Sequence, residues 1–77
     1  MNTLKETLQY ILSAITPPED KVIVESSTEN ETEILEIVAP KEIIGKIIGK
    51  EGKIIKSIRT ILSLSFPQSR FIVKIKD

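Results

Sequence analysis

Two apolar helical patterns meet at a short glycine-containing segment, and this feature constrains the fold more than any other. Before it, four isoleucines within residues 43–48 have the spacing of one helix face. After it, a second apolar pattern extends over residues 53–64. Gly49 and Gly52 enclose a lysine and a glutamate between the two patterns. The sequence therefore predicts a helix, a tight Gly-x-x-Gly loop over residues 49–52 and a second helix.

The chemistry of this loop suits a phosphate group. Glycine has no Cβ, so its backbone can lie directly against a bulky anion. Lys50 adds a positive charge between the glycines, and the N-terminus of the following helix favours an anion through its free N–H groups and its dipole. The same glycines could instead only connect two helices, one of them as a C-cap. The loop alone leaves both interpretations open.

Known nucleotide-binding loops do not match this segment. A P-loop requires four residues between its glycines and a serine or threonine after its lysine. Here Gly45 and Gly49 have three residues between them, and Glu51 follows Lys50. A dinucleotide-binding loop requires G-x-G-x-x-G, but residue 47 is isoleucine. Both mismatches argue against a mononucleotide or dinucleotide ligand.

Charge is divided along the chain, although the formal net charge is zero. Residues 1–40 carry two lysines and eight acidic residues, a net charge of −6, whereas residues 41–77 carry nine basic and three acidic residues, a net charge of +6. The positive charges gather around the glycine loop. A polyanion is therefore the expected partner of the second half of the chain.

Composition excludes several function classes. The 77 residues suffice for a single domain, expected over residues 1–77, that buries about 60% of its unfolded surface. The sequence contains no cysteine and no histidine, which excludes a disulfide framework, a thiolate metal site and the commonest proton shuttle. No stretch reaches the roughly 20 apolar residues of a membrane helix. We expect a cytoplasmic protein with no enzyme activity, no cofactor, no metal site and no membrane partner.

The helices have local signals at their starts and on their apolar faces. Thr3 and Glu6 form a capping-box pattern before an amphipathic helix that ends before Pro17. Pro40 is expected in the first turn of the helix that precedes the glycine loop. The core face of the helix over residues 53–64 is expected to comprise Ile54, Ile55, Ile58, Ile61 and Leu62.

Three strands complete the predicted fold. Residues 21–25 and 31–39 form β-branched runs, and the polar residues 26–30 between them predict a turn and hence a hairpin. Residues 71–76 alternate as a final strand after a polar connection. The order α-β-β-α-α-β predicts an α+β fold, with a three-stranded sheet and three helices packed on one face.

Residues 40–60 resemble the K-homology (KH) RNA-binding motif, in which an apolar pair precedes Gly-x-x-Gly and an apolar helix follows. The element order resembles the type II, prokaryotic form of this fold. Over its whole length the chain is similar to the small stand-alone bacterial KH proteins of the KhpA family. The resemblance rests on Ala39-Pro40, Gly45-Lys46-Ile47-Ile48-Gly49-Lys50-Glu51-Gly52-Lys53 and Ile58-Arg59-Thr60.

This resemblance implies that the protein binds single-stranded RNA, about four nucleotides at a time, and acts in RNA regulation or as an RNA chaperone. The glycines would give access to the RNA backbone, the lysines would contact phosphates, and an apolar groove would accept bases. Single-stranded DNA fits the same description, since four unpaired nucleotides do not by themselves require a 2′-hydroxyl. The RNA-binding residues carried over are Gly45, Lys46, Gly49, Lys50, Glu51, Gly52 and Lys53.

Two positions depart from the simplest phosphate site. Glu51 places a carboxylate inside the loop, where it partly cancels the charge of Lys50. Lys53 stands where family members often have arginine, and lysine keeps the charge but loses the bidentate phosphate geometry. Farther along the helix, Lys56 and Arg59 either steer RNA, pair with acidic neighbours within residues 29–36, or only keep the surface solvated.

A protein-interaction module is the alternative function. If one face of the sheet packs against the helices, then Ile34, Val38 and Ile72 must point to the other face. An apolar patch of this kind can mark an interface. The KhpA resemblance implies a homodimer or a heteromer with a larger KH-containing protein, and RNA binding and association are compatible with each other.

Overall fold

The computed structural model describes residues 3–17 and 21–76, and its elements follow the predicted order. A single 3₁₀ turn, η1 (Lys50–Gly52), separates the second and third helices. The helices are α1 (Leu4–Ile15), α2 (Lys41–Ile48) and α3 (Lys53–Ser65), and the strands are β1 (Ile23–Glu29), β2 (Thr32–Val38) and β3 (Phe71–Ile75). The predicted α+β fold of order α-β-β-α-α-β is confirmed.

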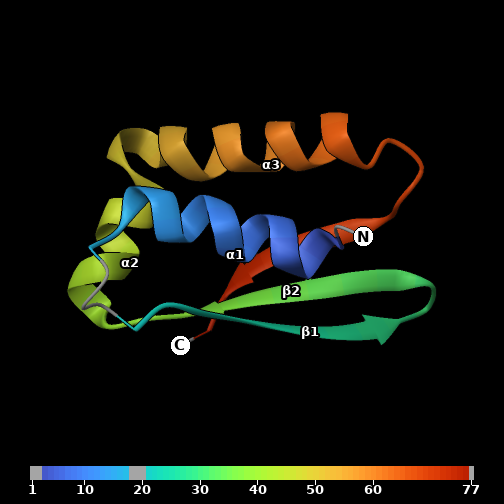
Figure 1. The fold of residues 1–77 in the computed structure, drawn as a ribbon, viewed down its shortest axis with the longest axis horizontal. Helices are drawn as coiled ribbons and strands as arrows, with labels where there is room; N and C mark the ends of the chain where they lie inside the picture. Colours follow the sequence, from blue (N-terminus) through green and yellow to red (C-terminus); the bar gives the residue numbers. More distant parts are fainter. Residues whose placement is uncertain (1–2, 18–20, 77) are drawn as a thin grey trace.

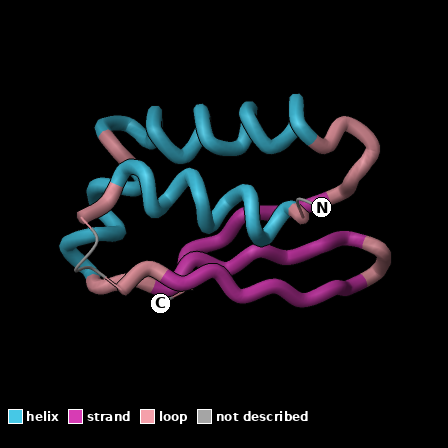
Figure 2. Tube along the Cα trace, in the orientation of Figure 1, coloured by secondary structure: helices cyan, strands magenta, loops and turns pink. Residues whose placement is uncertain are grey.

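The strands form one mixed sheet of order β1-β2-β3. β1 and β2 pair as an antiparallel hairpin. β2 and β3 are parallel, because the chain returns through α2 and α3 before it enters β3. Figures 1 and 2 show the helices on one side of the sheet, with α1 and α3 along its length and α2 at one end. The turn between α2 and α3 and the hairpin turn lie at opposite ends of the molecule (Figure 1).

The core lies between the sheet and the helices. Leu35 and Ile37 of β2 alternate with partly exposed neighbours and are fully buried, as period-two patterning predicts. Burial of each such side chain stabilises the fold by about 1.5–3 kcal/mol. The other side chains that are fully buried are Leu8, Leu12, Val24, Ile47 and Leu62.

The start of α1 has the capping box that the sequence predicts. The Thr3 hydroxyl oxygen accepts a hydrogen bond from the Glu6 amide at 3.0 Å, and the Glu6 carboxylate accepts one from the Thr3 amide at 3.0 Å. These two bonds satisfy backbone donors that a helix start would otherwise leave free. Ile15, at the other end of α1, is 45% exposed, so the buried face of this helix ends at Leu12.

The predicted hairpin boundaries are wrong. The structure continues β1 through Ser26, Ser27 and Thr28 and joins the strands by the two-residue turn Asn30–Glu31. Both turn residues have positive φ angles, 51° and 63°, as the two-residue turn that matches strand twist requires. Polar residues fit in β1 because it is an edge strand whose side chains are exposed, apart from Val24.

Gln9 of α1 completes the start of the β1 edge. Its side-chain nitrogen donates to the Val22 carbonyl at 2.7 Å, and its side-chain oxygen accepts from the Val24 amide at 2.9 Å. One side-chain amide therefore makes the two bonds that a neighbouring strand would make at this point. This arrangement fixes α1 against the sheet, and the sequence pattern did not predict it.

The buried face of α3 is narrower than predicted. Ile55, Ile58 and Leu62 are buried, but Ile54 is 41% and Ile61 46% exposed. The expectation that all five apolar residues belong to the core is therefore wrong for two of them. An outer helix is covered on one side only, so residues at the edges of its apolar arc remain partly in solvent.

The sheet face opposite the helices carries the apolar side chains expected there. Ile72 is 49% exposed, and Ile34 and Val38 are half-buried. Ile34 and Ile72 are neighbours in the β2–β3 register. Their position confirms the alternation from which the sequence analysis inferred an outward-facing patch.

Candidate nucleic-acid interface

The end of α2 is built around Gly49. Pro40 precedes the helix by one position instead of occupying its first turn, and its carbonyl accepts the amides of Ile43 and Ile44. At the other end, the Gly49 amide donates to the Gly45 carbonyl at 3.0 Å. Gly49 then turns the chain with φ 77° and ψ 176°. This backbone conformation is essentially restricted to glycine.

The loop over residues 49–52 closes on itself through two hydrogen bonds. The Gly52 amide donates to the Gly49 carbonyl at 3.1 Å, and the Lys53 amide donates to the Lys50 carbonyl. Glu51 (φ 57°, ψ 24°) and Gly52 (φ 73°, ψ 16°) both lie in the left-handed region. Glycine adopts this conformation easily, whereas for glutamate the conformation costs roughly 1 kcal/mol of strain energy.

Two backbone amides of this loop have no partner among the described residues. Neither the Lys50 amide nor the Glu51 amide donates a hydrogen bond within residues 3–17 and 21–76. Both residues are exposed. Successive free N–H groups at a helix start attract anions, and here they come directly before α3.

No carboxylate of the described residues forms an ion pair with the lysines of the loop. Within the described residues the one ion pair joins Lys76 Nζ to Glu25 Oε1, 3.2 Å apart on the sheet. Lys46, Lys50 and Lys53 are exposed. Lys56 bends back toward the loop, with its Cε atom 3.9 Å from the position that a Cβ atom on Gly52 would occupy. The structure therefore brings Lys56 to the loop, whereas Arg59 lies one turn farther along α3.

Gly45 leaves the surface of α2 open. It lies inside the helix and is exposed, and a Cβ atom at this position would have no described heavy atom from outside α2 within 4 Å. Lys41, Ile44, Gly45 and Ile48 share one helix face at spacings of three and four residues. Ile47 points the other way and is fully buried in the core, while Ile48 is half-buried. A ligand can thus approach the α2 backbone along this face.

An apolar hollow of about 450 Å³ lies between the start of α2 and the end of β3. It shares Lys41 and Ile44 with the open face of α2, so the hollow and the glycine loop lie along one surface. The sequence pattern does not predict this hollow, because its walls come from segments more than thirty residues apart. The lining residues are Ala39, Lys41, Ile44, Ile75 and Lys76.

In the described part of the chain, β3 is an edge strand and leaves one row of backbone groups unpaired by strands. The Arg70 carbonyl accepts from Glu33, and the Lys76 amide donates to Ile37, so even-numbered residues of β3 turn their backbone groups toward β2. In a parallel pair the intervening residues turn theirs away. The N–H and C=O groups that face the free edge are those of Phe71, Val73 and Ile75.

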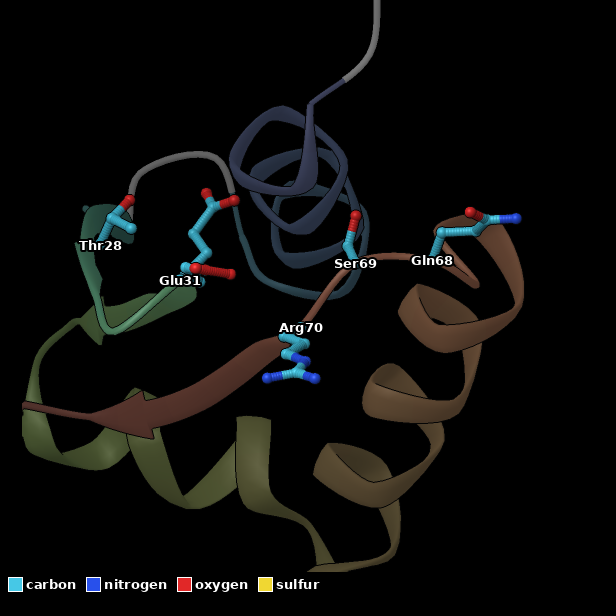
Figure 3. A pocket seen from close by; sticks show the side chains of 6 residues that line it. Thr28, Glu31, Gln68, Ser69 and Arg70 are labelled. Atoms are coloured by element: carbon cyan, nitrogen blue, oxygen red, sulfur yellow. The ribbon is translucent and has the colours of Figure 1, made fainter.

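The opposite end of the molecule has a different chemistry. A hollow of about 410 Å³ lies between the hairpin turn and the connection from α3 to β3. Figure 3 shows Thr28 and Glu31 on one side, Gln68 and Ser69 on the other, and Arg70 below. Glu33 also lines this hollow, so two carboxylates face a single guanidinium group. This excess of negative charge is unsuited to a polyanion.

The charge division of the sequence is thus partly a division in space. Glu31 and Glu33 lie at the end of the molecule opposite the glycine loop (Figure 1), and Glu19 and Asp20 lie outside the described residues. Lys56 and Arg59 form no ion pair with described residues, so pairing with acids of residues 29–36 is not observed. The described residues contain no group of three potential metal ligands. None of the helices in the described part is long and apolar enough to cross a membrane.

Comparisons with known proteins agree with this geometry. The sequence model of the KH domain of KhpA and KhpB matches residues 5–76. The chain is 36% identical to an RNA-binding protein KhpA of Thermotoga maritima, over 90% of this chain and 92% of the relative. It is 36% identical to an RNA-binding protein KhpA of Treponema pallidum, over 95% and 94% of the two chains. A relative of the same name from Chlamydia trachomatis is 42% identical over 77% and 76%.

No solved structure gave a significant match. The family assignment therefore rests on sequence similarity that spans nearly the whole chain, and the fold described above agrees with it. The chain belongs to the KhpA/KhpB family of KH-domain proteins.

Proposed function

We propose that this protein binds single-stranded RNA and clamps about four nucleotides between the glycine loop and the neighbouring groove. The observation that carries the proposal is the pair of unpartnered amides at Lys50 and Glu51, surrounded by lysines that no described carboxylate holds. The relatives named above are RNA-binding proteins, which supports the same ligand class.

The proposed path of the RNA follows the open surface. Phosphates lie against Gly49–Gly52, where the free amides, Lys50 and Lys53 supply donors and positive charge. The sugar-phosphate backbone continues along α2 at Gly45, where no side chain intervenes. Bases enter the apolar hollow beside Ile44 and Ile75.

The free edge of β3 offers hydrogen bonds to those bases. Amide N–H and C=O groups of the odd-numbered residues face outward beside the hollow. Unstacked bases present their Watson–Crick edges to such groups. Aromatic platforms are not needed in this arrangement, which suits a chain with one tyrosine and two phenylalanines.

The proposed cellular role is RNA regulation or chaperoning. A footprint of about four nucleotides gives weak, rapidly exchanging contacts. Such contacts allow one protein to act on many RNA segments. Single-stranded DNA remains a competing ligand in this proposal, because none of the groups on the proposed path requires a 2′-hydroxyl.

The direct test is a titration of labelled single-stranded RNA with the wild type and with the double variant Lys50→Asp, Glu51→Asp. The variant turns a neutral loop into one of charge −2, so we expect binding to fall by about a hundredfold or more. Aspartate tolerates the left-handed conformation, so the fold should remain intact by circular dichroism. Lys5→Asp, on α1 at the other end, is the control and should bind normally. Equal binding by all three proteins would exclude the loop as the site.

A second candidate function, protein association, is favoured by the outward-facing patch of Ile34, Val38 and Ile72. We propose a homodimer or a heteromer with a larger KH-containing protein as the form that this patch would support. Sedimentation of the wild type and of Ile72→Lys over a range of concentrations tests the homodimer. A monomer at all concentrations, unchanged by the substitution, would contradict self-association through this face.

A further inference from the structure

Two hydrogen bonds and one side chain hold Gly49 in place. Its amide donates to Gly45 at the end of α2, and its carbonyl accepts from Gly52 within the loop. Its third contact is with a side chain of α3. A Cβ atom on Gly49 would lie 2.6 Å from Cγ1 of Ile54 and 2.9 Å from Cβ and Cδ1 of the same residue. The Ile54 side chain therefore occupies the space next to the Gly49 backbone.

The exposure of Ile54 separates this contact from the core. Ile54 is 41% exposed, whereas Ile55 and Ile58 on the same helix are buried. The residue therefore adds less to the core than its neighbours do. Ile54 lies in the first turn of α3, and its side chain lies next to Gly49 of the loop. Helical periodicity alone predicts a core position for Ile54 and no role in the site.

We propose that Ile54 is a positioning residue for the RNA site. By packing on Gly49 it holds the end of α2 against the start of α3, and so it fixes the direction of the free Lys50 and Glu51 amides before RNA arrives. A loop that is already ordered loses less conformational entropy on binding. This inference rests on the proposed function, because it names the residue that prepares the same loop.

The test compares three single variants that change one isoleucine each. Ile54→Ala removes the Cγ1 and Cδ1 atoms that face Gly49, whereas Ile54→Val keeps Cβ and a Cγ1 atom. Ile61→Ala is the matched control, since Ile61 lies two turns farther along α3 and is similarly exposed, 46% against 41%. Thermal unfolding of all three, followed by circular dichroism, measures the structural effect alone.

The expected result is a difference in RNA affinity between variants of similar stability. With a labelled RNA of about four nucleotides, Ile54→Ala should bind about threefold to tenfold more weakly than Ile61→Ala, and Ile54→Val should bind within about twofold of the wild type. Equal affinities of the two alanine variants would overturn the proposal. So would an affinity of Ile54→Val as low as that of Ile54→Ala.

A readout without RNA separates this inference from the proposed function. The Gly52 and Lys53 amides are bonded inside the loop, so their hydrogen exchange reports loop opening. Both amides should exchange at least about threefold faster in Ile54→Ala than in Ile61→Ala. If the wild type bound no RNA, the proposed function would fail, and this difference would show only that Ile54 orders the loop. Equal exchange rates in the two variants would overturn the positioning role whatever the RNA result.

Discussion

The glycine loop and the hairpin turn are both tight turns with non-glycine residues at positive φ. They differ in whether the neighbouring backbone amides are hydrogen-bonded. At the hairpin, Asn30 and Glu31 adopt φ 51° and 63° so that β1 and β2 can pair without interruption. At the loop, Glu51 adopts φ 57°, and the Lys50 and Glu51 amides find no partner among the described residues. Positive φ therefore allows continuous β1–β2 pairing at the hairpin, whereas at the loop it accompanies two amides without a described hydrogen-bond acceptor.

Hydrogen bonding of the backbone, and not φ alone, separates the structural turn from the candidate site. Positive φ and exposed charges occur at both ends of the molecule, so neither feature is diagnostic alone. The loop combines free amides with unheld lysines, while the hairpin end combines a paired backbone with carboxylates.

The largest expected effect is on stability, from a methyl group at the first loop glycine. Gly49→Ala should lower the free energy of unfolding by about 2–4 kcal/mol, because it combines a glycine-only conformation with a clash against Ile54. Gly52→Ala should lower it by only about 1 kcal/mol, since a Cβ there meets nothing closer than 3.9 Å. Urea denaturation measures both. Equal losses would contradict the assigned difference between the two glycines.

The next effect is the salt dependence of RNA binding. Neutralisation of about two to four phosphates predicts a log–log slope of roughly −1.5 to −3, or roughly a tenfold to sixtyfold loss between 50 and 200 mM salt. Lys53→Gln should make the slope less negative by about 0.7, whereas Lys5→Gln should not change it. Fluorescence anisotropy at several salt concentrations gives the slopes. A flat response would show that charge at the loop does not drive binding.

Gly45→Ala should change stability and affinity in opposite directions. Alanine is favoured over glycine inside a helix by about 0.5–1 kcal/mol, and a Cβ here would meet no described residue outside α2, so the unfolding free energy should rise. RNA binding should weaken by about the same amount if the ligand lies against α2. Thermal unfolding and an RNA titration on one preparation check both. Higher stability with unchanged affinity would move the RNA path away from Gly45.

The smallest effect comes from relieving the two strained glutamates. Glu31→Gly and Glu51→Gly each remove a left-handed glutamate, so each should raise stability by up to about 1 kcal/mol. Only Glu51→Gly also removes a carboxylate from the glycine loop, and it should tighten RNA binding by about twofold. Parallel denaturation and titration of the pair measure these changes. Tighter binding by both variants would indicate a general charge effect instead of a local one.

The sequence predicted what depends on local patterns. The order of the six elements, the capping box of Thr3 and Glu6 and the loop between the two glycines are confirmed as structure. Each follows from residues close together in the chain. The RNA-binding roles of the loop residues stay predictions.

The features that the sequence did not predict depend on which elements become neighbours. The hollow between Ile44 and Ile75 needs β3 to lie beside the start of α2, and the free edge of β3 depends on strand order. The hairpin was placed too early in the chain, because serine and threonine favour turns as well as exposed edge strands. Ile54 and Ile61 have the right periodicity for the core, but helical periodicity does not determine how much of the apolar face of α3 the rest of the protein covers.

The two edges of the sheet differ in their free hydrogen-bonding groups, because the Gln9 side chain binds part of the β1 edge. By bonding to Val22 and Val24, its side chain leaves less of the β1 edge available to a strand from another molecule. Among residues 3–17 and 21–76, no strand covers the β3 edge, which lies beside the apolar hollow. The protein can therefore offer backbone groups to a ligand on one edge while limiting fibre-like stacking of copies through the other.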